Sequence, residues 1–528
     1  MSLREKGTDR ELLAAPSPLL VVERGDQRRV QVRTLRLEDG LLVADLPRGA
    51  GRAGIRLTAN DHYFTVEAAL LEVPGATAFT FFQIVPALTA YLGQMAGLAS
   101  DDASGVCLRS LALEVDTSFR GSPPLCRAWT TAAHGLTGHR VALAAGPRTA
   151  LTAMLRHMAE NEPVPRSAHG GPWAMESEAN RGSYLFADLA AKDADAWIEL
   201  ARRGGFTHIH LHGWWTTLGH YEPRRAYFPG GLEEMREVAE RIRAAGLNVG
   251  MHTLTGCIDP NDPWVTPVPS PHLIAARNYT LAKAVAPDDT AIEVIEMPAA
   301  DHDVVWSYSG RGNALRLGGE IIRYSGVSRT PPYAFLGCER GAFKTVAAAH
   351  AAGAAVDYLL QRYIAFYPEP TSPLADELAE RIANVYNTCG VSMIYFDGSE
   401  GMGSRFGIDA MRWQIFQRLS GGMTEASCHG HNNWWLHSRL GAWDHPVWAM
   451  RQFHDQHIRL ASRYRLTDLL EPQLGWWAPR GPSAIARGHF PDEMEYFAAK
   501  NLAMEDRKSV GEGQRVDLGG RRIIKKKI

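Results

Sequence analysis

Two patterns of hydrophobic and polar positions divide the chain. In residues 1–160, short runs such as "RRVQVRTLRL" and "LALEVDTSF" alternate apolar with polar residues, and Gly, Pro and Asp interrupt them. Alternation with a period of two is typical of half-buried strands, so this region predicts a β-rich domain of the sandwich type. The stretch "NEPVPRSAHGGPW", with its prolines and glycine pair, indicates a linker.

From about residue 180, strand patterns and helix patterns take turns. The runs "SYLFA", "THIHLHG" and "NVGMHTL" predict strands, and "DADAWIELARRGG" and "GLEEMREVAERIRAAG" predict the helices between them. Strands and helices that alternate at this spacing indicate parallel βαβ units. Residues 273–356 break the rhythm with β-rich runs, which we interpret as a small β domain inserted in a barrel loop.

The alternation then resumes. The runs "YLLQRYIAFY", "VSMIYFDG" and "MTEASC" predict strands, and "LTDLLEPQLGWW" contains another. About seven strands result, one short of a TIM-type (β/α)8 barrel. The expected domains are an N-terminal β-sandwich (1–160), the first part of a catalytic barrel (161–272), a β-rich insertion (273–356), the second part of the barrel (357–505) and an atypical basic tail (506–528).

The tail "EDRKSVGEGQRVDLGGRRIIKKKI" has no periodicity, and its basic end matches nothing before it. Two interpretations stay open. The tail is a sequence artefact that replaces the natural continuation, so that the last barrel strand is missing, or it is a genuine disordered basic tail.

Composition narrows the class of protein. The chain has 528 residues, 45% hydrophobic and 22% charged, which is ordinary for a globular protein of two or three domains. A net charge of −2 does not indicate a surface that binds nucleic acid. The six cysteines form no CxxC pair, so neither a disulfide framework nor a thiolate zinc site is expected. No signal peptide or apolar run of membrane-spanning length is seen, which predicts a cytoplasmic protein, or an extracytoplasmic one if the start is incomplete. Nothing predicts the oligomeric state.

Active sites of such barrels lie at the C-terminal ends of the strands. The apolar run in "VSMIYFDGSEGMG" ends abruptly in Asp397 and Glu400, with glycines 398 and 401 beside them. An acid at the end of a buried strand is costly unless it is paired or functional. The alternative is that Asp397 only caps the following loop.

Other predicted strands also end in acids, imidazoles and tryptophans. Glycoside cleavage needs one carboxylate at the anomeric centre and a second that protonates the leaving oxygen. Tryptophans offer flat faces to sugar rings. Any single Trp is more often a core residue, but the repeated WW next to polar strand ends favours a pocket. Asp259 and Asp262 lie in a proline-rich loop that is either rigid through its own Asx turns or contacts substrate. The further candidates are Glu425 for catalysis and His210, His212, Trp214, Trp215, His252, Glu400, His431, Trp434, Arg439, Asp444 and Glu471 for substrate binding.

The motifs "IHLHGWW", "GLNVGMHTLTG", "IYFDGSEG", "MTEAS" and "SRLGAWD" resemble (β/α)8-barrel glycoside hydrolases, specifically uncharacterised bacterial relatives of α-galactosidase-like enzymes. The resemblance covers about 180–500. It implies a retaining hydrolase of O-glycosidic bonds in an oligo- or polysaccharide, with Asp397 as nucleophile. The acid of that family is an Asp two strands later, whereas here the nearest acid is Glu425, one strand later, and Glu471 is a rival. No cofactor or metal is expected.

Three other functions compete with this interpretation. A metal-dependent hydrolase of the amidohydrolase type uses an HxH pair, as in His210 and His212, and His252, His429 and Asp397 could complete its site. That pair normally ends the first barrel strand, whereas here it ends the second. A polysaccharide lyase could use His252 or Tyr395 as base. A non-catalytic carbohydrate-binding protein fits the sandwich and the tryptophans, but it needs no acids at strand ends.

Overall fold

The fold is described from a computed structural model. Contacts group the chain into unit 1, which comprises Met1–Phe186, Leu200–Ile209 and Gly421–Ile528, and unit 2, which comprises Ala187–Glu199 and His210–Ser420. Within the described residues, no helix is long and apolar enough to cross a membrane. The structure describes residues 2–26, 29–32, 34–120, 124–167, 182–303, 312–426, 434–435, 450–469, 476–477, 488–500, 517–518 and 521–522.

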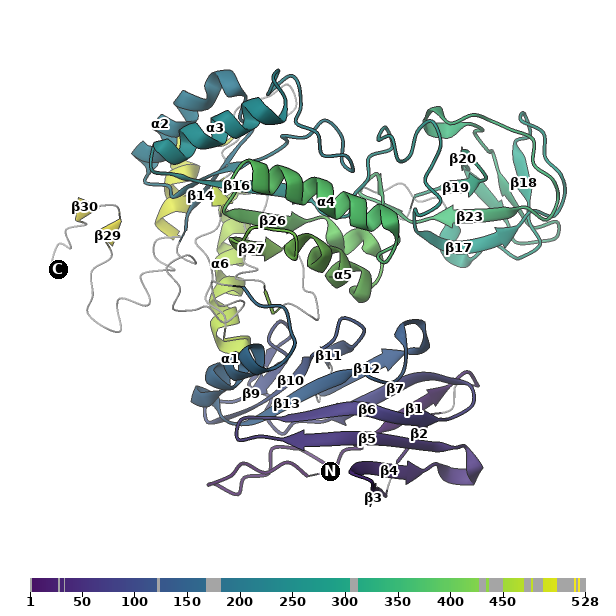
Figure 1. The fold of residues 1–528 in the computed structure, drawn as a ribbon, viewed down its shortest axis with the longest axis vertical. Coiled ribbons are helices and arrows are strands. Elements are labelled where there is room, and N and C mark those ends of the chain that lie inside the picture. Colours follow the sequence, from purple (N-terminus) through teal and green to yellow (C-terminus); the bar gives the residue numbers. More distant parts are fainter. Residues whose placement is uncertain are drawn as a thin grey trace. The chain divides into compact units, whose positions relative to one another are not determined.

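The N-terminal part of unit 1 contains two antiparallel sheets (Figure 1). Many of their strands alternate buried with less buried residues, as β12 does throughout its length. The five-stranded sheet has the order β11 (Asp116–Arg120), β12 (Leu125–Thr131), β7 (Ala76–Ile84), β1 (Val21–Arg24), β2 (Arg29–Gln31). The eight-stranded sheet has the order β3 (Arg36–Glu38), β4 (Leu41–Asp45), β5 (Arg52–Ala59), β6 (Phe64–Glu72), β13 (Arg140–Pro147), β10 (Ser104–Ser110), β9 (Leu98–Ser100), β8 (Tyr91–Gly93).

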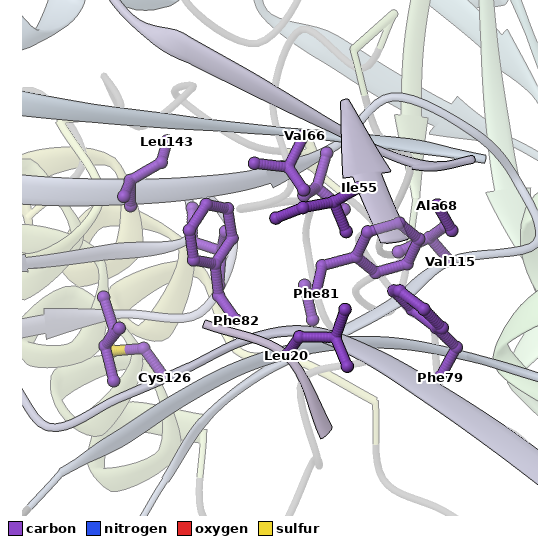
Figure 2. Close-up of a cluster of buried hydrophobic side chains, with 14 of the residues drawn as sticks. Leu20, Ile55, Val66, Ala68, Phe79, Phe81, Phe82, Val115, Cys126 and Leu143 are labelled. Atoms are coloured by element: carbon purple, nitrogen blue, oxygen red, sulfur yellow. The ribbon is translucent and has the colours of Figure 1, made fainter. Parts of the chain in front are cut away.

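One hydrophobic core joins these two sheets. Phe79 and Phe82 of β7 lie in the same buried cluster as Ile55 of β5 and Val66 of β6 (Figure 2). Apolar side chains from two facing sheets in one core are the arrangement of a β-sandwich, as the alternation predicts for residues 1–160. The last residues of that range are not strand but helix α1 (Leu151–Asn161).

The C-terminal part of unit 1 is tied to the sandwich by a buried carboxylate. Asp468 directly follows helix α6 (Met450–Thr467) and accepts hydrogen bonds from the backbone N–H groups of Met95 (2.7 Å) and Ala96 (3.0 Å). Asp468 is 1% exposed, so these bonds are shielded from water. The remaining strands of this part are β27 (Met423–Ala426), β28 (Trp476–Trp477), β29 (Asp517–Leu518) and β30 (Arg521–Arg522), and β29 pairs with β30 within the predicted unstructured tail.

Alternating strands and helices follow the sandwich, as the sequence predicts. Within unit 2, β16 (Asn248–Leu254) and β26 (Met393–Asp397) pair in parallel. Helix α4 (Pro373–Thr388) shows why the helices form here: Pro373 occupies its first turn, and the side chain of Ser372 caps Ala375 N–H. The other elements of this type are β14 (Tyr184–Ala187), β15 (His208–Leu211), α2 (Ala194–Gly204), α3 (Leu232–Ala244) and α5 (Arg405–Phe416).

The predicted barrel is found only in part. Strands β14 and β28 pair in parallel within unit 1, strands β16 and β26 pair in parallel within unit 2, and no closed ring of strands is formed within the described part of the chain. The strand predicted over 358–367 is wrong. Its first residues belong to antiparallel β23 (Ala355–Leu359), and the rest is a hairpin of β24 (Gln361–Arg362) and β25 (Ala365–Phe366).

The insertion is a β-rich body with its own core, in agreement with the sequence pattern. Its sheets have the orders β17-β23-β19-β20 and β18-β22-β21, and Leu315, Ile322 and Phe335 lie in its buried cluster. The strands not yet given are β17 (Ala275–Thr280), β18 (Ala291–Glu293), β19 (Ala314–Leu317), β20 (Glu320–Arg323), β21 (Gly326–Ser328) and β22 (Ala334–Leu336).

Glu320, the first residue of β20, accepts several hydrogen bonds inside the insertion. Its carboxylate is fully buried and accepts hydrogen bonds from the Arg340 guanidinium (2.8 and 2.7 Å) and from the N–H groups of Gly341 and Ala348, and it lies 3.2 Å from His350 Nε2. Burial alone raises the pKa of Glu320, but these donors outweigh it, so the pKa lies below its ordinary value. A single carboxylate thus binds together three segments of the insertion.

Candidate active site

Asp397 ends the buried strand β26 and stands partly in solvent. The four residues before it are buried, whereas the Asp397 side chain is 31% exposed. Gly398 turns the chain with a φ of 76°, which a residue with a side chain rarely adopts, and donates its N–H to Asp397 Oδ1 (2.9 Å). The Asp397 carbonyl accepts a bond from Thr255 N–H (2.5 Å). The backbone on both sides therefore fixes where this carboxylate points.

The imidazole of His252, in β16, lies against this carboxylate. Its Nε2 lies 3.3 Å from Asp397 Oδ2, and its side chain is 5% exposed. Its ring stacks on His212 (4.8 Å between centroids) and on Tyr395 (5.5 Å). Trp215 is a third aromatic neighbour, at 5.6 Å. His252 therefore sits within a stack of flat rings and presents one nitrogen to Asp397.

Asp188, which is not among the residues predicted from the sequence, adds a second carboxylate to this cluster. It directly follows β14, and its Oδ1 lies 2.8 Å from Nδ1 of His212. The hydrogen bond with His212 lowers the pKa of Asp188, and the charge of His252 contributes in the same direction. The signal was present: "YLFAD" is a buried strand that ends in an acid, the same pattern that selects Asp397.

The two tryptophans after β15 have different positions. Trp214 is 1% exposed, and its indole N–H donates to the carbonyl of His252 (2.9 Å). It therefore supports the aromatic stack from within the protein. Trp215 is partly exposed and meets the ring edges of His212 and Trp214. Of the pair, Trp215 is the one whose face a ligand can reach.

His210 lies within β15 and is fully buried, whereas His212 directly follows the strand and is partly exposed. Its ring lies against Gly250 of β16, where a Cβ would come within 2.3 Å of His210 Nδ1. A glycine inside a strand often marks such a close approach. His210 is thus packed into unit 2 below the open cluster.

The loop after Asp397 carries Glu400 and is held from two sides. Ser399 accepts a hydrogen bond from Nε of the fully buried Arg412 (2.9 Å). A Cβ on Gly401 would come within 1.9 Å of the Tyr367 hydroxyl, so only glycine fits there. Glu400 itself is partly exposed and forms a hydrogen bond with Tyr363.

Asp262 supports the rigid-loop interpretation of its segment. It is fully buried and accepts bonds from Thr217 Oγ1, the backbone and ring N–H groups of His220, and Trp264 N–H. Asp259 similarly closes an Asx turn through Asn261 N–H (2.7 Å). His220, which is bonded to Asp262, also lines a cleft of about 310 Å³; Glu222, Arg225, Arg381 and Asn384 are among its other lining residues.

Two further candidates, Glu425 and Trp434, belong to unit 1, whereas this cluster belongs to unit 2. Glu425 lies in β27 of unit 1, is fully buried, and contributes with burial to a raised pKa of Tyr184. Trp434, expected as a sugar platform, is 1% exposed in unit 1; it donates to the carbonyl of Ser110 (3.0 Å) and lies under the Arg109 guanidinium. Trp434 is therefore a packing residue. His429, His431, Arg439, Asp444 and Glu471 lie outside the described residues.

The ligand set of the amidohydrolase interpretation is not assembled among the described residues. In that part of the chain, no three His, Cys, Asp or Glu side chains are grouped so that they could hold a metal ion. His210 packs on Gly250, whereas His212 is bonded to Asp188. The HxH pair, which the sequence presents as one unit, thus has two separate structural roles.

Comparison with known proteins gives similar structures but no family. No family model matches the chain, and no curated protein matches it. A GH36 α-galactosidase, AgaA of Geobacillus stearothermophilus with raffinose, is 10% identical, with 96% of this chain and 77% of that chain covered and a TM-score of 0.47. The α-N-acetylgalactosaminidase NagBb of Bifidobacterium bifidum is 11% identical (96% and 90% covered, TM-score 0.44). The α-galactosidase TtGalA of Thermus thermophilus with stachyose is 13% identical (93% and 94%, TM-score 0.38). At these identities and TM-scores, the similarity establishes neither family nor activity.

Proposed function

We propose that this chain is a glycoside hydrolase that cleaves O-glycosidic bonds in an oligo- or polysaccharide, with Asp397 as its nucleophile. The observation that carries the proposal is the position of Asp397: a partly exposed carboxylate at the end of a buried parallel strand, next to a stack of imidazole and indole rings. Glycosidases require a carboxylate that reaches the anomeric carbon beside a surface that binds a sugar ring.

In the proposed reaction, one oxygen of Asp397 attacks the anomeric carbon as the bond to the leaving oxygen breaks. The leaving oxygen takes a proton from a second carboxyl group, for which the sequence offers Glu425 and Glu471 as candidates. Water then attacks the glycosyl–Asp397 ester, gives its proton to the second carboxylate, and releases the sugar with its original anomeric configuration.

The neighbours of Asp397 have distinct roles in this scheme. His252 Nε2, 3.3 Å from Asp397 Oδ2, orients the carboxylate and can donate to it or to a sugar hydroxyl. Asp188, kept ionised by His212, is an acceptor for hydroxyl groups. Trp215 offers an apolar face to the C–H side of a pyranose ring. Charged acceptors beside an aromatic surface are the usual composition of a sugar pocket.

A panel of α- and β-linked aryl glycosides tests the proposal. The purified protein is expected to release phenol from at least one of them, and Asp397→Asn is expected to lose nearly all of that rate because the amide is a poor nucleophile. Glu377→Gln, a change on the exposed side of α4, is the matched carboxylate control. Failure of the wild-type protein on every glycoside contradicts the proposed function, and full activity of Asp397→Asn contradicts the assignment of the nucleophile.

The stereochemical course is tested separately. Nuclear magnetic resonance of the first product formed from the active substrate reports its anomeric configuration before mutarotation. Retention is expected if Asp397 forms a covalent intermediate, whereas inversion requires Asp397 to act as a base toward water.

A further inference from the structure

The hairpin of β24 and β25 has an unusual turn. Its two loop residues, Tyr363 and Ile364, have φ angles of 52° and 61°, and Arg362 pairs with Ala365 across them. Two-residue turns with positive φ at both positions strongly favour Asn-Gly or Asp-Gly. A β-branched residue such as isoleucine is a genuine outlier in this conformation. The turn therefore holds two large side chains where small or flexible residues relieve strain.

The base of this hairpin lies against the loop that follows Asp397. On one leg, the Tyr367 hydroxyl donates to the carbonyl of Gly398 (3.4 Å) and fills the space where a Gly401 side chain would stand. On the other leg, Leu360 lies 3.3 Å from the position of a Cβ on Gly403. The turn is three to four residues beyond these contacts, about 10 Å at the rise of a strand. The hairpin is thus anchored to the backbone that positions the nucleophile.

The side chains of the turn reach the same site. Tyr363 forms a hydrogen bond with Glu400, and burial followed by the charge of Glu400 raises the pKa of Tyr363 to about 12, with a contribution from Asp397. The phenol is therefore a neutral donor at ordinary pH. Ile364 is 60% exposed. The strained turn thus places the Tyr363 hydroxyl next to Glu400. It also holds the apolar side chain of Ile364 in solvent.

Resting on the proposed function, we propose that Tyr363 and Ile364 form the wall that contacts the leaving-group sugar and determine specificity for it. Strained backbone persists at functional sites because the side chains it places there are needed. His252, at the centre of the ring stack, is 5% exposed, whereas Ile364 is 60% exposed, so in this proposal the turn meets the outer part of a bound substrate. In a pocket that holds the sugar to be transferred, that outer part is the leaving group.

The double variant Y363N/I364G tests this inference, because it keeps the turn and removes both side chains. The thermal midpoint is expected to rise, since Asn-Gly fits the φ angles. The value of kcat/KM is expected to fall about tenfold or more for an oligosaccharide, while hydrolysis of the matching glycosyl fluoride, whose leaving group is one atom, stays within a factor of about three.

Each outcome either supports or overturns the role of Tyr363 and Ile364. Equal loss on both substrates, or no loss on either, overturns the inference. Wild-type protein that hydrolyses neither substrate refutes the proposed function, and the inference with it. If the double variant folds poorly, Ile364→Ala and Tyr363→Phe keep the backbone; a selective loss on the oligosaccharide in either supports the inference, and unchanged selectivity in both overturns it.

Discussion

Two carboxylates of unit 2 are held in opposite ways. Glu320 of the insertion is fully buried, with the Arg340 guanidinium and two backbone N–H groups bonded to its oxygens. Asp397 ends a buried strand, yet its side chain is 31% exposed, and it meets His252 at 3.3 Å. Placing a charge at either position costs free energy, but only Glu320 is fully enclosed by protein.

This difference distinguishes acids that stabilise the fold from acids that are available for a reaction. A carboxylate enclosed by donors stabilises the native state and cannot reach another molecule. An acid that is fixed by its backbone and left open to solvent contributes less to stability and remains available for reaction. Asp262, sealed by Thr217, His220 and Trp264, belongs to the first kind, whereas Asp188 belongs to the second.

The largest expected effect is on rate. Asp397→Asn should lower kcat by a factor on the order of 10⁴ or more, because the attacking atom is lost. Its free energy of unfolding should stay within about 0.5 kcal/mol of the wild-type value, since the side chain is partly exposed. Steady-state kinetics and urea unfolding measure the two quantities. A large loss of stability in this variant contradicts the distinction between the two carboxylates, because Asp397 would then stabilise the fold as Glu320 does.

The next effect is on stability. Glu320→Gln removes the charge from a buried pair and should lower the free energy of unfolding of the insertion by about 3–5 kcal/mol, as it leaves Arg340 uncompensated. Glu339→Gln, in the exposed pair with Arg323 of the same insertion, is the control and should cost less than about 1 kcal/mol. Urea unfolding that shows equal costs for the two variants contradicts the structural role of Glu320.

A smaller effect concerns substrate binding. Asp188→Asn replaces a charged acceptor with a neutral amide and should raise KM roughly tenfold, with a smaller change in kcat. Steady-state kinetics on the best substrate of the panel tests this expectation. An Asp188→Asn variant that loses kcat to the same extent as Asp397→Asn shows that Asp188 takes part in the chemistry and not only in binding.

The smallest effect is a shift in a titration. Because the hydrogen bond from His212 lowers the pKa of Asp188, the pair is intact above the ordinary aspartate range near 4 and is lost only as the pH falls through the lower native value. Carbon NMR of aspartate carboxyl groups should place the Asp188 midpoint below that range. His212→Phe should move it upward, and identical midpoints in the two proteins refute the coupling.

The sequence predicts the polar residues at strand ends better than it predicts turns and long-range packing contacts. Asp397 was selected because a buried strand visibly ends in a polar residue, and Asp188, which directly follows β14, fits the same rule but was overlooked. The strand predicted over 358–367 failed because Tyr363 and Ile364 make a turn without any turn-forming residue. No local pattern reveals that Trp434 packs on Ser110, since 324 residues separate them in the chain.

The most direct test of the central claim is to identify the residue that becomes covalently glycosylated. A 2-deoxy-2-fluoro glycosyl fluoride of the active sugar slows hydrolysis of the intermediate, and digestion followed by mass spectrometry locates the attached sugar. The expected result is a label on the peptide that contains Asp397, absent in Asp397→Asn. A label on Glu400, Glu425 or any other carboxylate of the active protein contradicts the assignment of Asp397 as the nucleophile.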